Sequence, residues 1–72
     1  MPSTRPLDDE HEVVVRYDGK GGSLHRATAE IYPKGENRQM GPVFEGEGRT
    51  MTSAEDRALA AARSWFFNRP RR

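Results

Sequence analysis

The stretch from Gly46 to Phe67 reads GEGRTMTSAEDRALAAARSWFF and carries the strongest helix signal in the 72-residue chain. Its apolar residues recur at steps of three and four, which gathers them on one face of a helix. The members of that face are Ala58, Leu59, Ala62, Trp65 and Phe66. The pattern predicts a helix over 53–67 whose apolar face covers another element.

Both ends of this helix have sequence signals. Thr52 and Glu55 form a T-x-x-E capping box, and Ser53 offers a second one with Asp56. The two acids would also lie near the positive end of the helix dipole. Pro70 disfavours helical geometry in the residue before it, so the helix should end soon after residue 68.

Three segments before the helix have the composition of strands. They read EVVVRYD (12–18), LHRATAEIYP (24–33) and PVFEGEG (42–48). Apolar and polar residues alternate in them, as in strands with one buried face. The alanines of the second segment would let a helix lie close to the sheet. The predicted core is Val13, Val15, Ala27, Ala29, Ile31, Phe44, Leu59, Ala62, Trp65 and Phe66.

The connections complete the predicted fold. GKGGS (19–23) is typical of a hairpin turn, and KGENRQMG (34–41) of a longer polar loop. Residues 1–11 show no apolar periodicity and are expected to be disordered or extended. We therefore predict one α+β domain over 12–68, with a three-stranded antiparallel sheet (β-β-β-α) covered on one face by the helix, and a basic tail over 69–72.

Composition narrows the classes of function. The net charge is +1, which excludes a broadly basic nucleic-acid surface but leaves room for a local patch. The chain has no cysteine, and its two histidines, His11 and His25, do not make a metal site. We expect neither a metal ion nor a cofactor. No apolar run is long enough to cross a membrane, and a cytoplasmic location is the default expectation.

Residues 22–66 resemble the last three strands and the final helix of a double-stranded RNA-binding domain. The resemblance rests on SLH before a strand, on RATAEIYPKG and PVFEGEG as strands, and on RTMTSAEDRALAAARSWF as a helix. The G-x-G step before the helix and the spacing of Ala58, Ala61 and Ala62 are its best parts. The resemblance implies RNA contact through the loop between the first two strands, where His25 matches the family's loop histidine and Lys20 and Arg26 stand beside it.

The sequence departs from this family in two places. The family opens with an RNA-contacting helix, whereas this chain has two prolines and an acidic run there. The family also has a phosphate-binding lysine pair at the start of its last helix, and the aligned residues here are Glu55 and Asp56. Carboxylates repel phosphates, so the family's main phosphate contact is not expected in this chain.

We expect no enzyme, because Ser, His and acidic residues do not occur at the spacing of a catalytic site. The sequence therefore leaves two binding functions open. The first is a non-catalytic module that binds a protein partner or a second copy through its open sheet face and edges. Phe67 would mark such a contact if exposed, or fold over the last strand. The alternative is weak, shape-directed RNA binding. Its candidate residues are Lys20, His25, Arg26, Arg49, Arg69, Arg71 and Arg72.

Overall fold

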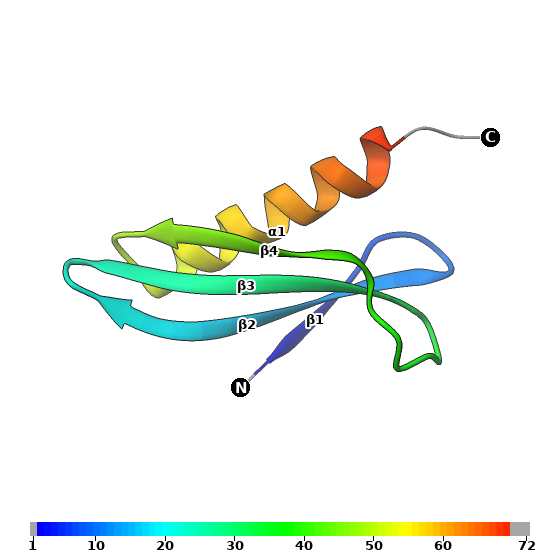
Figure 1. Ribbon diagram of the computed structural model, residues 1–72, viewed down its shortest axis with the longest axis horizontal. Coiled ribbons are helices and arrows are strands. Elements are labelled where there is room, and N and C mark those ends of the chain that lie inside the picture. Colours follow the sequence, from blue (N-terminus) through cyan, green and yellow to red (C-terminus); the bar gives the residue numbers. More distant parts are fainter. Residues whose placement is uncertain (1, 70–72) are drawn as a thin grey trace.

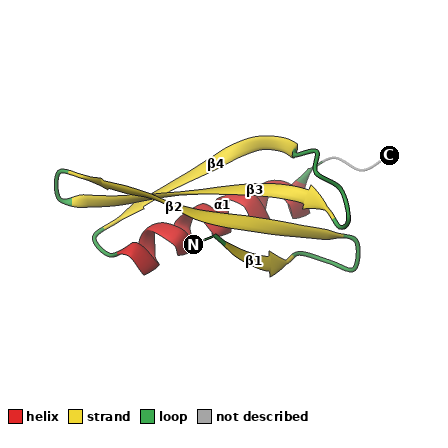
Figure 2. Cartoon of the chain, turned by 90° about the horizontal axis from the view of Figure 1, so that it is seen from below, coloured by secondary structure: helices red, strands yellow, loops and turns green. Residues whose placement is uncertain are grey.

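A four-stranded antiparallel sheet with one helix across a single face makes up the protein in its computed structural model, which describes residues 2–69 (Figure 1). The strands follow the chain in the order β1-β2-β3-β4, and β1 and β4 form the two borders of the sheet (Figure 2). The elements are β1 (Ser3–Pro6), β2 (His11–Gly21), β3 (Leu24–Pro33), β4 (Met40–Gly48) and α1 (Met51–Asn68). The α+β class and the C-terminal helix are as predicted.

The predicted count of three strands is wrong, because Ser3–Pro6 adds β1 to the sheet. This strand pairs with β2 in the register Ser3↔Val15 to Pro6↔Glu12. Its residues lack apolar periodicity since the pairing uses backbone groups, and three of the four side chains are exposed. Leu7, directly after the strand, packs against the core and its N–H donates to the His11 carbonyl over 3.0 Å.

The GKGGS segment forms the β2–β3 hairpin, as its composition predicts. Gly21 pairs with Leu24 across a two-residue turn, and Gly22 has a φ of 64° there. A glycine with positive φ at this position is typical of hairpin turns. The hairpin reaches beyond the start of α1, at the left of Figure 1.

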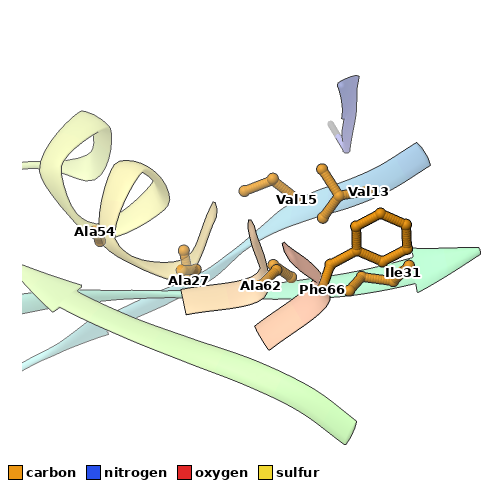
Figure 3. Packing of buried hydrophobic residues seen from close by; sticks show 9 residues of the cluster. Val13, Val15, Ala27, Ile31, Ala54, Ala62 and Phe66 are labelled. Carbon is orange, nitrogen blue, oxygen red and sulfur yellow. The ribbon is translucent and has the colours of Figure 1, made fainter. Parts of the chain in front are cut away.

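The core lies between the sheet and α1 (Figure 3). Alanines on both sides let the two layers approach closely, because a small side chain leaves little space between backbones. The fully buried residues are Val13, Val15, Ala27, Ala29, Ile31, Ala54, Ala58, Ala62 and Phe66. Of the predicted core residues, Phe44, Leu59 and Trp65 are partly buried and pack against this cluster. Ala54, one turn before Ala58, is a core residue that the sequence reasoning missed.

The helix begins two residues earlier than predicted. Its N-cap is Thr50, whose hydroxyl accepts a hydrogen bond from the Ser53 N–H over 3.0 Å, while the Thr50 N–H donates to the Ser53 hydroxyl over 3.3 Å. The capping boxes expected at Thr52 and at Ser53 are therefore wrong. No acidic side chain lies in the first turn, so the predicted interaction of Glu55 with the dipole is also lost.

The aromatic residues at the end of α1 divide between core and surface. Phe66 is buried, and Trp65 packs on Phe44 with ring centroids 5.8 Å apart. Phe67 is 45% exposed and stands edge-on to the Phe66 ring at 5.1 Å. The sequence left open whether Phe67 is exposed or folds over the last strand, and the structure shows it exposed.

Candidate functional site

Three of the candidate RNA-contacting residues lie at one end of the molecule. Lys20 pairs with His25 across the β2–β3 hairpin, and His25 pairs with Gly48 on its other side. Arg49 follows Gly48 directly. The Tyr17 hydroxyl is 2.7 Å from His25 Nδ1, which fixes the ring on the face that α1 covers further along the sheet.

Arg26 lies on the opposite, open face of the sheet and is surrounded by acids. Its Nη2 is 2.9 Å from Oε2 of Glu47, which stands opposite it on β4. The hydrogen bond to Glu47 raises the pKa of Arg26 above its ordinary value, and the charges of Glu47, Glu45 and Asp18 act in the same direction. A phosphate would have to compete with these carboxylates, so Arg26 is a poor anchor for RNA.

Arg69 is the one remaining basic candidate within the described residues, and it lies far from the hairpin. Arg69 caps the other end of α1, where its guanidinium lies 4.4 Å from the centroid of the Phe66 ring and Nη1 is 3.7 Å from Sδ of Met40. Arg71 and Arg72 fall outside the described residues. The predicted set is thus split over two ends and two faces. Lys20, His25, Arg26 and Arg49 lie at the hairpin end, where Lys20 and Arg26 line one small hollow, and Arg69 lies at the other end of α1.

A different surface follows the outer border of β4. A shallow groove there is lined by Glu45, Gly46, Glu47 and Arg57. Nη1 of Arg57, on α1, donates to the backbone carbonyl of Glu47 over 3.0 Å. This carbonyl therefore points away from β3 and out of the sheet. We refer to these four residues as the β4 edge.

Acidic side chains dominate the open face next to this edge. Arg16 and Arg26 are its cations, and each is bound to a glutamate: Arg16 Nε is 3.0 Å from Glu30 Oε1. The hydrogen bond to Glu30 raises the pKa of Arg16. Among residues 2–69 no ion pair involves Glu45, which is exposed. Within the described residues Glu45 is thus an exposed carboxylate at the border of the sheet that makes no ion pair, and its charge acts on Arg26 only from a distance.

His11 has a structural role, since it joins Phe66 of α1 to Asp8 of the β1–β2 connection. Its ring lies 4.8 Å from that of Phe66, and Nδ1 is 2.9 Å from Oδ1 of Asp8. The Asp8 carboxylate is bonded to the Glu10 N–H and to the His11 ring. Both contacts lower the pKa of Asp8, and the hydrogen bond from the Glu10 N–H lowers it most. Within residues 2–69, no group of three or more His, Asp or Glu side chains is arranged to hold a metal ion, and no helix is long and apolar enough to cross a membrane.

The sequence predicts exposed sheet edges as binding surfaces, but it does not identify the β4 edge among them. The alternation of acids in PVFEGEG does indicate two carboxylates on one face of a strand. The position of Arg57 has no such signal, since it depends on where α1 crosses β4. Comparisons with known protein families, with curated proteins and with solved structures find no match to this chain.

Proposed function

We propose that this chain is a small, non-catalytic cytoplasmic module that binds protein by accepting an extended strand along the β4 edge. The observation that carries the proposal is the outward Glu47 carbonyl at an unpaired border of the sheet. Backbone groups alternate in direction along a strand, so Glu45 also turns its N–H and C=O outward. A row of such groups is a template for an added strand.

The opposite border is a poorer template. β1 has only four residues, and its last, Pro6, has no N–H to donate. β4 has nine residues, and its proline, Pro42, lies away from Glu45 and Glu47. An incoming strand therefore has more backbone partners at β4 than at β1.

The test is a titration of the ¹⁵N-labelled chain with synthetic peptides of about eight residues, a common strand length, in basic, neutral and acidic versions. Strand addition predicts that at least one peptide shifts the amide signals of Glu45 and Glu47 before those of β1. A panel that leaves both signals unmoved at millimolar peptide would refute strand addition at this edge.

A proline variant isolates the backbone contact. Glu45→Pro removes an N–H that points away from β3, so the β3–β4 ladder keeps its own hydrogen bonds. We expect this variant to remain folded by circular dichroism and to lose the peptide response. Unchanged peptide affinity in the folded variant would mean that the peptide binds by its side chains elsewhere.

A second candidate function is weak, shape-directed binding of double-stranded RNA, in line with the family resemblance. It is favoured by the position of Lys20, His25, Arg26 and Arg49 at the hairpin end, where Lys20 and Arg26 line one hollow. It is opposed by the pairing of Arg26 with Glu47. In the same titration, a short RNA duplex at low salt should shift the signals of residues 20–26 if this function holds, and leave them in place if it does not.

A further inference from the structure

Resting on strand addition at the β4 edge, we infer that the occupant is an extended segment with Lys or Arg at alternate positions, and not a second copy of this chain. The inference names the chemistry of the partner. Three observations support it. Two glutamates flank the outward backbone groups of β4, an arginine is already bonded to that backbone, and the β4 strands of two copies would pair poorly with each other.

The first step is the charge that faces an added strand. Glu45 and Glu47 are two residues apart and project from the same open face of the sheet. Side chains of a neighbouring strand would lie about 4.5–5.5 Å from them, measured between Cβ atoms. Arg26 forms its ion pair with Glu47, and Glu45 acts on it only through its charge, so the Glu45 carboxylate can take a closer cation from the partner. Opposite charges directly across two strands stabilise their pairing, and like charges oppose it.

The second step is that this edge already binds guanidinium groups. Arg57 donates to the Glu47 carbonyl over 3.0 Å, and Arg26 donates to the Glu47 carboxylate over 2.9 Å. One residue of β4 is thus contacted by two arginines, one from α1 and one from β3. These two contacts indicate that the β4 edge is suited to bind a guanidinium or another cationic group.

A second copy is a poor occupant when it pairs through its own β4. If two β4 strands paired antiparallel around Gly46, Glu45 of one copy would stand opposite Glu47 of the other. Pairing centred on Glu45 would set that residue against itself. A register centred on Phe44 avoids both clashes, but it would run into the segment of β4 where its own pairing with β3 is irregular. Each register therefore costs either charge repulsion or ladder hydrogen bonds.

The α1 side of the groove sets a further condition on the partner. Gly46 has no side chain, and Arg57 occupies the Glu47 carbonyl that an incoming N–H would need. The partner must displace Arg57 from this acceptor, and it should have small residues at the positions between its cations. Arg57 thus protects the edge in the free chain, as charged side chains commonly do at sheet borders.

The experiment compares three peptides in which valine alternates with threonine. The two threonines to be aligned with Glu45 and Glu47 are Lys, Gln or Glu, and the residue between them is alanine. Affinity is measured from the amide shifts of these two residues. We expect the Lys peptide to bind about tenfold more tightly than the Gln peptide at low salt, and the difference to shrink as salt is raised. The Glu peptide should bind least.

Two variants test the named side chains. Glu45→Lys should reverse the preference between the Lys and Glu peptides, whereas Glu36→Lys, the same charge change on the exposed β3–β4 loop, should leave it. Arg57→Ala should tighten the Lys peptide by removing both a competing donor and a like charge. Equal binding of Lys and Gln peptides, or an unaltered preference in Glu45→Lys, would overturn the inference.

The outcomes also separate the inference from the function on which it rests. If the neutral peptide binds β4 as well as the basic one, strand addition stands and the basic partner is refuted. If no peptide shifts the β4 signals, the proposed function itself fails. A concentration-dependent dimer in sedimentation, with the same two signals moving, would identify a second copy as the occupant and contradict the inference.

Discussion

Gly46 and Gly48 are the residues that let α1 lie against β4. Both are buried in a strand, although glycine has a low preference for strands. A Cβ on Gly46 would meet backbone atoms of Ala54 and Ala58, and one on Gly48 would meet the hydroxyl of Ser53. The sequence indicates a close approach at these glycines, and the structure identifies the helix backbone as the neighbour.

Substitution of Gly46 by alanine should therefore destabilise the domain. The added methyl group meets backbone, which cannot rotate away, so the expected loss of unfolding free energy is about 1–3 kcal/mol. Gly21→Ala is the matched control, because a Cβ there has no atom within 4 Å and the residue has no positive φ. Thermal or urea unfolding measures both. Equal stability of the two variants would show that α1 does not pack against β4 at this distance.

Charged residues show the limit of sequence reasoning at this scale. The sequence shows that Arg26 and Lys20 are basic, and the alternation of residues 24–33 predicts which face of the sheet Arg26 takes. It does not tell which partner each side chain finds, because Glu47 is 21 positions from Arg26. The family resemblance and charge group Arg26 with the other RNA candidates, whereas its long-range ion pair with Glu47 gives it a partner within the chain.

At the scale of elements, the start of α1 depends on Thr50. Three Thr and Ser residues between 50 and 53 fit an N-cap by type, and the T-x-x-E pattern favoured Thr52. The observed choice follows from the end of β4 at Gly48, since only the next two residues remain to turn the chain. Local pattern thus predicted a helix and its face, but not its first residue.

Removal of the cap hydroxyl tests this assignment. Thr50→Ala should lower the free energy of unfolding by about 1 kcal/mol, because the Ser53 N–H loses its acceptor. Thr52→Ala is the control, since alanine is a better helix former than threonine and Thr52 is exposed inside α1. If Thr52→Ala were the more damaging change in a denaturation experiment, the predicted cap would be right after all.

β1 is the element that the sequence did not reveal. Its residues STRP have no buried alternation, and two prolines nearby argued against regular structure. An edge strand of four residues needs only backbone partners, and β2 supplies them. β1 forms a short border of four residues opposite the nine residues of β4, and the three-strand prediction did not include this difference.

At the scale of the whole molecule, one sheet face is closed by α1 and the other is open and acidic. The long axis of 42 Å follows the β2–β3 hairpin and α1, so the hairpin end and the C-terminal end of α1 lie far apart, and the β4 edge adjoins the hairpin end through the pairing of Arg26 with Glu47. The closed face was predictable from alternation and helix periodicity. The functional difference between the surfaces was not, since it arises from pairing across the sheet.

Hydrogen exchange of the β4 amides in the free, monomeric chain tests the central claim most directly. The account predicts fast exchange at Glu45 and Glu47, whose N–H groups point out of the sheet, and slow exchange at Gly46, whose N–H pairs with β3. Addition of the Lys peptide should then slow Glu45 and Glu47. Slow exchange at both residues in the free monomer would show that the edge is already covered, and would contradict a free template for strand addition.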